Sequence, residues 1–178
     1  MPGSSSLLAG VPGALLAVLL ILPGACHADT LAEYRLKAAF LFNFVSFTEW
    51  PAGVGNTLNL CIFGPDPFGD DLDKLQGKSV GGRILAVRRT NSVSSLAECQ
   101  VVFITRQVSG SLPRVLDYLD GRPVLTVSDT PGAARQGVAL NMDTDQSKVT
   151  FEANLGAARS NGLGLSSKLL RLVREVYQ

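Results

Sequence analysis

The residues best suited to bind a ligand are polar side chains that follow three apolar segments of the chain. They are Asp66 after segment 57–63, Arg106 after segment 100–105, and Ser128 with Asp129 after segment 123–127. The guanidinium of Arg106 would clamp an anion, and Ser128 or Asp129 would anchor a polar group of the same ligand. If the three segments are neighbouring parallel strands, these residues share one rim, where open α/β sheets bind small molecules.

The same residues also fit a purely structural role, which the sequence favours. Asp66, Ser128 and Asp129 each stand just before a predicted turn or helix, where short polar side chains accept hydrogen bonds from free backbone N–H groups. Ligand contact and capping therefore both stay open at this point.

No catalytic set emerges from the remaining polar residues. His27 is the only histidine, which argues against a histidine-based triad or a histidine-rich metal site in the mature domain. The run Gly77-Lys78-Ser79 lacks the leading glycine of a phosphate-binding loop and precedes a strand. Ser166, Ser167 and Lys168 are too close together for serine–lysine catalysis. We therefore expect no enzyme activity, no cofactor and no metal.

The cysteines indicate an exported protein with one structural disulfide. Residues 1–28 contain no charged side chain and include an apolar run followed by small residues, which is typical of a secretory signal peptide cleaved after Ala28. Cleavage removes Cys26, unless that residue is lipid-modified, and leaves Cys61 and Cys99. An even count in an exported chain predicts a bridge between them. The sequence contains no Cys-x-x-Cys motif, so we do not expect thiol exchange chemistry.

Length and composition predict a single packed domain and argue against a nucleic-acid partner. The chain has 178 residues, of which 46% are hydrophobic and 17% charged, so one packed domain is expected over residues 29–178. Its 16 basic and 15 acidic residues give a net charge of +1. This balance argues against nucleic-acid binding, which usually requires a basic surplus.

Helical and strand-like segments alternate along the domain. A helix over residues 31–48 begins at a capping box formed by Thr30 and Glu33. Its buried face is expected to contain Leu36, Ala39, Phe40, Asn43 and Phe44. Further helices are predicted at 67–75, 112–119, 155–161 and 166–177. Strands are predicted at 57–63, 83–89, 100–105, 123–127, 138–142 and 148–152.

This alternation predicts a single α/β domain with a mostly parallel sheet and helices on both faces. The last two strands, joined by a polar turn, form an antiparallel hairpin expected at the sheet edge. Trp50, between Glu49 and Pro51, has two interpretations. It is an exposed anchor for a partner protein, or, as the sequence favours, an aromatic side chain packed at the end of the first helix.

Seven stretches in order resemble the YfiR family of periplasmic regulators. They are KAAFLFNF (37–44), FTEWP (47–51), CIFGPDPFG (61–69), CQVVFI (99–104), VLTVSD (124–129), FEANL (151–155) and SSKLLRL (166–172). The resemblance implies a non-enzymatic periplasmic α/β domain, often dimeric, whose paired cysteines match Cys61 and Cys99. This chain lacks the second cysteine pair that some relatives carry near the hairpin.

The resemblance further implies a place in cyclic di-GMP signalling and biofilm control. Such proteins repress an inner-membrane diguanylate cyclase of the YfiN type by direct binding, and an outer-membrane lipoprotein of the YfiB type captures them. An alternative function is a periplasmic small-molecule receptor that uses the rim formed by Asp66, Arg106, Ser128 and Asp129.

Overall fold

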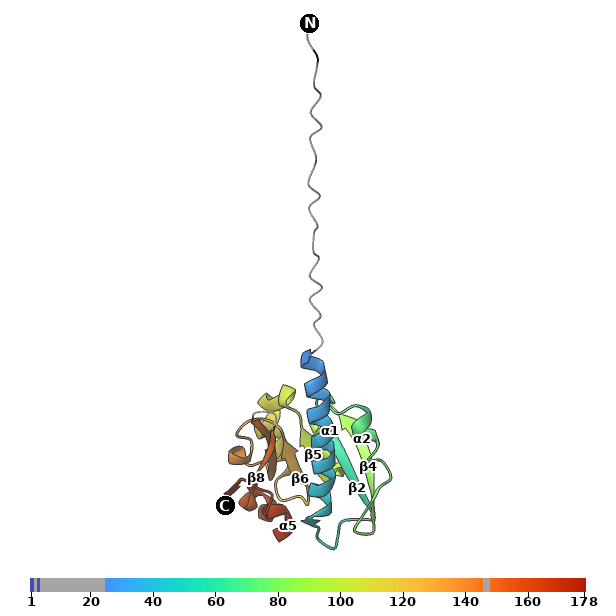
Figure 1. Cartoon of the computed structure of the whole chain (residues 1–178). Coiled ribbons are helices and arrows are strands. Elements are labelled where there is room, and N and C mark those ends of the chain that lie inside the picture. The colour runs from blue at the N-terminus through green and yellow to red at the C-terminus, as the bar shows by residue number, and fades with distance from the viewer. Residues whose placement is uncertain (2, 4–24, 146–147) are drawn as a thin grey trace.

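The computed structural model describes residues 25–145 and 148–178, together with residues 1 and 3. Most of the predicted signal peptide lies outside these residues, so its cleavage stays a prediction, as does the fate of Cys26. Figure 1 shows a long first helix lying across a twisted sheet.

In this part of the chain, eight strands form the main sheet, in the spatial order β10-β8-β7-β6-β5-β2-β4-β3. The central strands β6, β5, β2 and β4 are parallel neighbours, and β7 also runs parallel to β6. The strands are β2 (Thr57–Phe63), β3 (Ser79–Val80), β4 (Arg83–Thr90), β5 (Val101–Ile104), β6 (Leu125–Ser128), β7 (Leu140–Asp145), β8 (Lys148–Asn154) and β10 (Glu175–Tyr177). A separate antiparallel pair joins β1 (Thr48–Glu49) to β9 (Gly164–Leu165).

Helices cover both faces of the sheet. They are α1 (Ala25–Ser46), α2 (Asp70–Asp73), α3 (Leu112–Leu119), α4 (Leu155–Ser160) and α5 (Ser167–Leu170). Three 3-10 segments connect elements: η1 (Val93–Glu98), η2 (Arg106–Ser111) and η3 (Ala134–Gln136). The predicted α/β class, the mostly parallel sheet and the cover on both faces are confirmed.

Alternating side chains of the central strands fill two cores. In β2, Leu60 and Ile62 belong to the cluster that contains the buried residues of α1 and α2. Cys61 and Phe63 belong to the cluster on the other face, with α3 and η1. All four are at most 4% exposed, which explains why the strand reads as a continuous apolar run.

Helix α1 differs from the prediction in its start and its buried face. It begins at Ala25, so Thr30 lies inside the helix and the predicted capping box with Glu33 is wrong. The face against the sheet contains Ala38, Leu41, Phe44 and Val45, whereas Leu36 is 44% exposed. Almost every residue from 36 to 45 is apolar, so spacing alone could not determine which side the sheet covers.

The segment after residue 166 also differs from the prediction. Instead of a helix over 166–177, α5 spans only Ser167–Leu170 and is followed by β10, which pairs in parallel with β8. Backbone bonding to the free side of β8 therefore replaces further helical turns, beginning with the bond from Arg174 N to Phe151 O. The β7–β8 hairpin is confirmed as antiparallel. However, the hairpin does not form the edge of the sheet as predicted, because β10 lies outside β8. Residues 146–147, in the turn of the hairpin, lie outside the described residues.

The remaining boundaries match the prediction or differ by a few residues, except at the second predicted helix. Strand β2 and helix α3 have the predicted limits. The first helix ends at Ser46, before Pro51, and the helix predicted over 67–75 is reduced to α2. The short strands β1, β3 and β9 were not predicted, because two residues carry no detectable period.

Candidate functional site

The predicted rim exists, because β2, β5 and β6 are adjacent and parallel. Their carboxyl ends lead into Gly64, Thr105 and Asp129 at the same edge of the sheet. Gly64 has a positive φ of 103°, and a Cβ atom there would lie 2.4 Å from Thr105 Oγ1. Glycine at position 64 thus allows the loops after β2 and β5 to approach each other.

Three of the four predicted rim residues lie together, and one does not. Arg106 donates from Nε and Nη2 to the main-chain oxygen of Asp129, at 3.1 and 2.7 Å. Ser128 Oγ donates to Ile104 O at 2.8 Å and accepts from Thr130 N at 3.1 Å. These bonds tie the ends of β5 and β6 together.

Asp66 is directed elsewhere. Its carboxylate accepts from Phe68 N at 2.7 Å and from Arg89 Nε at 2.7 Å. The first bond closes a local turn, and the second is an ion pair with β4. These contacts match the capping interpretation of Asp66, and the structure does not bring it to Asp129.

Asp129 forms the centre of a buried polar cluster that joins α1 to the rim. Its side chain is 0% exposed. Oδ2 accepts from Tyr34 Oη at 2.6 Å and from Lys37 Nζ at 3.2 Å. Oδ1 is buried and has no hydrogen-bond partner among the described residues, and neither has the nearby strand-end oxygen Thr105 Oγ1.

Lys37 supplies the charge that balances Asp129. Its side chain is 0% exposed, it forms a second ion pair with Glu33 one helical turn earlier, and its Nζ lies 4.7 Å from the centre of the Tyr34 ring. A buried ion pair offsets the desolvation of both charges only when it is also well hydrogen-bonded. Glu33 also accepts from Thr144 Oγ1 at 2.8 Å, which links α1 to β7.

The cluster holds its groups in defined protonation states. Burial raises the pKa of the Glu33 carboxyl, but hydrogen bonds from Lys37 and Thr144 outweigh this effect, so its pKa lies below the ordinary value. Burial and the hydrogen bond to Asp129 raise the pKa of Tyr34 well above that of a free tyrosine. Tyr34 is therefore a permanent hydrogen-bond donor to the Asp129 carboxylate.

Through these contacts, the cluster connects α1 to Asp129 at the end of β6 and to Thr144 in β7. Among the residues that the structure describes, no group of three or more His, Cys, Asp or Glu side chains is placed to hold a metal ion. The groups with a free capacity are Asp129 Oδ1, which can only accept, and the Thr105 hydroxyl.

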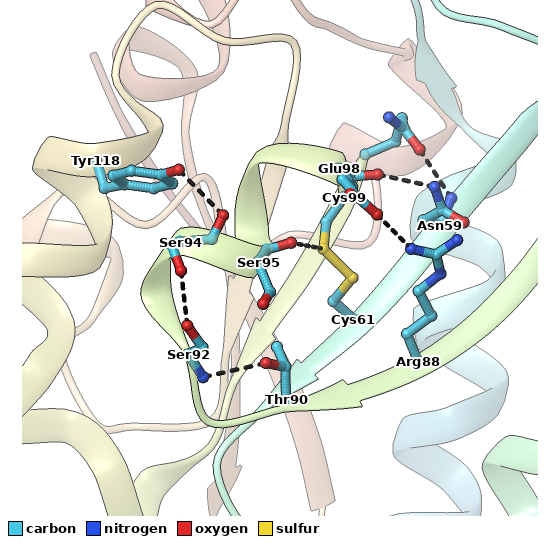
Figure 2. Close-up of a disulfide and its surroundings, with 11 residues drawn as sticks. Asn59, Cys61, Arg88, Thr90, Ser92, Ser94, Ser95, Glu98, Cys99 and Tyr118 are labelled. Carbon is cyan, nitrogen blue, oxygen red and sulfur yellow. Dashed lines mark hydrogen bonds and ion pairs between the residues drawn. A yellow bond between two sulfur atoms is a disulfide. The ribbon is translucent and has the colours of Figure 1, made fainter.

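The disulfide joins Cys61 in β2 to Cys99, which directly follows η1 (Figure 2). Both cysteines are at most 2% exposed. Arg88 of β4 extends to Glu98 beside the bridge and forms an ion pair of 2.7 Å. The bridge and this pair hold η1 against the sheet.

A family comparison identifies the chain. The sequence profile described as YfiR/HmsC-like matches residues 34–174. The chain belongs to the YfiR/HmsC-like family. Membership of the YfiR/HmsC-like family indicates a regulatory protein of periplasmic cyclic di-GMP signalling. Within residues 25–145 and 148–178, no helix combines the length and apolar character needed to cross a membrane.

Two solved structures share the fold of this YfiR/HmsC-like chain. A conserved domain protein from Vibrio cholerae has 8% identity and a TM-score of 0.52, with 80% of this chain and 60% of that chain covered. The ABC domain from Streptococcus pneumoniae, in complex with L-Trp, has 9% identity and a TM-score of 0.51, with 81% and 60% covered. The chain thus spans about three fifths of either protein, and at these identities only the fold is shared.

Trp50, the predicted partner anchor, is half-buried. Its Nε1 donates to Val45 O at the end of α1, at 3.3 Å, and its ring packs against the core on that face. This is the geometry expected of a packed aromatic residue, and the part of the ring still exposed keeps the anchor role a prediction.

Sequence reasoning missed the α1 side of the cluster. Glu33 and Lys37 were predicted to lie off the buried face of the first helix, and Tyr34 was given no role. In the structure, Tyr34 and Lys37 donate to Asp129, and Glu33 pairs with Lys37. The available signal was Lys37 directly before the apolar run 38–42, with a carboxylate four residues earlier. A lysine in that position is either exposed or paired inside, and Glu33 pointed to pairing.

Proposed function

We propose that this protein is a periplasmic, non-enzymatic repressor that binds an inner-membrane diguanylate cyclase of the YfiN type. The observation that carries the proposal is the family match over residues 34–174, which includes nearly all of the predicted mature domain. A disulfide in a chain that begins with a signal-like segment supports export from the reducing cytoplasm.

Repression of this kind is a shift of populations. The repressor binds the inactive state of the cyclase more tightly than the active one and moves the equilibrium by that difference in affinity. An outer-membrane lipoprotein of the YfiB type that captures the repressor lowers its free concentration, and the cyclase returns to activity by mass action. The family resemblance, in which such domains are often dimeric, adds a homodimer to the states of the repressor that should be tested.

Cellular cyclic di-GMP is the direct test. Deleting the gene should raise the cyclic di-GMP level, and the full chain expressed in trans should restore it. A version lacking residues 1–28 should fail to restore the level although the cell accumulates it. An unchanged level in the deletion strain under several growth conditions, with the cyclase present, would contradict the proposal.

The buried free oxygens at the rim favour a second function, a small-molecule receptor. Asp129 Oδ1 and Thr105 Oγ1 lack partners among the described residues, and both lie at the strand ends where α/β folds bind ligands. The Streptococcus pneumoniae domain with the same fold was solved in complex with L-Trp, which makes L-Trp the first ligand to try.

Thermal unfolding with L-Trp tests this receptor function. Binding to the folded state raises the midpoint temperature as ligand exceeds its Kd. Arg106→Ala should abolish the shift if the rim is the site, while Arg114→Ala, an exposed arginine of α3, should retain it. A shift that survives Arg106→Ala would exclude the rim as the L-Trp site.

A further inference from the structure

A groove of about 380 Å³ lies between α1 and α2, on the opposite side of α1 from the polar cluster at Asp129. Figure 1 shows the two helices next to each other, and the ion pair between Arg35 and Asp71 joins them. The volume lies within the range of small-molecule sites. The apolar surface of the groove consists of Ala38, Ala39, Phe42 and Leu75.

Positive charge predominates around this apolar surface. Three cations, Arg35, Lys74 and Lys78, and a single carboxylate, Asp71, line the groove. Asp71 Oδ1 accepts from Lys74 at 2.6 Å, and Asp71 Oδ2 accepts from Arg35 at 3.4 Å. The one carboxylate is thus shared by two of the three cations, and the groove keeps a surplus of two positive charges.

Lys78 has no carboxylate partner among the described residues. Its Nζ lies 5.3 Å from the centre of the Phe42 ring, so the ammonium group is held at the edge of the apolar surface. A cation held over an aromatic ring next to an apolar hollow can bind an acid group while the rest of that ligand covers the ring.

The surroundings set the orientation of such a ligand. At the other end of α2, a neighbouring hollow contains Asp66 and Asp70. Asp66 is neutralised by Arg89, but Asp70 is exposed and would repel an anion there. The acid group therefore belongs at the Lys78 end, and the apolar part points toward Arg35.

We propose that this groove binds a small amphipathic anion, with its carboxylate or sulfonate beside Lys78 and its apolar part on Phe42 and Leu75. Ala39 is exposed at the mouth, and its small side chain keeps the groove open. The site is separate from the rim, and it goes beyond the proposed repressor function without depending on it.

A pair of fluorescent probes tests the proposal on protein purified from the periplasm after export of the full chain. 8-Anilinonaphthalene-1-sulfonate carries the required acid group, and N-phenyl-1-naphthylamine is nearly the same molecule without it. At low ionic strength, Lys78→Gln should weaken sulfonate binding about tenfold, which is the contribution of one charge-assisted hydrogen bond. Binding of the neutral probe should change less than twofold.

Two further variants locate the site. Ala39→Trp fills the groove from its mouth and should weaken both probes, whereas Lys168→Gln, an exposed lysine of α5, should leave both unchanged. Circular dichroism and urea unfolding confirm that each variant is folded.

Three outcomes would overturn the proposal. The first is that the wild-type protein fails to bind the sulfonate at millimolar concentration. The second is that the Ala39→Trp variant binds it as well as wild type does. The third is that Lys78→Gln weakens binding of the two probes equally. The last result would mean that Lys78 contributes packing on Phe42 and no anion recognition.

Discussion

At the scale of single residues, the most consequential feature is a fully buried lysine. Lys37 is 0% exposed and depends on Glu33 and Asp129 for compensation, while Tyr34 completes the hydrogen bonding of Asp129. Such a group adds little net stability compared with an apolar core, but removing one partner leaves a buried charge uncompensated.

Lys37→Met keeps the aliphatic stem and removes the charge. We expect the free energy of unfolding to fall by about 3–5 kcal/mol, because the buried Asp129 carboxylate then loses its ion-pair partner. Urea denaturation measures the loss. Lys168→Met, at an exposed position, should change stability by less than about 0.5 kcal/mol.

The double variant Lys37→Met with Asp129→Asn checks the cause. Replacing the carboxylate by an amide removes the uncompensated charge and should recover part of the loss. A double variant that is less stable than Lys37→Met alone by the full effect of Asp129→Asn would show that the two side chains are not coupled.

Glu33 predicts a pH dependence of stability. Its pKa in the folded protein lies below the ordinary value of 4.5, so the unfolded chain binds the proton more tightly. Its contribution is fully present above about pH 4.5 and is lost as the pH falls through the lower folded-state pKa. We therefore expect Glu33→Gln to lose less stability than wild type between pH 5 and about pH 3. Urea midpoints that decline in parallel for both proteins would contradict this assignment.

At the scale of elements, the last helix shows that a local cap signal can place the start of a helix without determining its length. The sequence predicts that either Ser166 or Ser167 caps the last helix, and in the structure it is Ser166 whose Oγ accepts from Leu169 N at 3.3 Å. The helix nevertheless ends after Leu170, because the residues that follow pair with β8. A cap forms between a side chain and backbone groups a few residues away. The length of this helix depended instead on the free edge of β8, which is distant in sequence.

The cap can be tested with its neighbour as control. Ser166→Ala should lower the free energy of unfolding by about 1 kcal/mol, because it leaves the N–H of Leu169 without its acceptor. Ser167→Ala, at an exposed position inside the same helix, should be within about 0.5 kcal/mol of wild type. Equal effects of the two substitutions would contradict the capping role.

At the scale of the whole molecule, the disulfide connects parts of the chain separated by 38 residues. It closes a loop that includes α2, β3, β4 and η1. Removing this closure increases the entropy of the unfolded chain more than it changes the folded packing.

Replacing both cysteines by alanine should therefore cost about 4 kcal/mol in the chain-entropy account. The comparison is the urea midpoint of the Cys61→Ala, Cys99→Ala protein against oxidised wild type, with reduced wild type as a second reference. If oxidised and reduced wild type unfold at the same urea concentration, the bridge is not a stabilising element.

The sequence by itself determined the α/β class, the limits of β2 and α3, the shared rim and the cysteine pair. These follow from local patterns, because strand-forming runs and turn residues are present in the chain however it folds, and two of its three cysteines remain after the predicted signal peptide is removed. Only the tertiary structure decided which side of α1 is buried, how Lys37 meets Asp129, and that β10 replaces a helix. A helix that is apolar on every side can turn any face inward, and the partner of a buried charge or of a strand edge lies far away in sequence. Long-range packing therefore made the choices that periodicity left open.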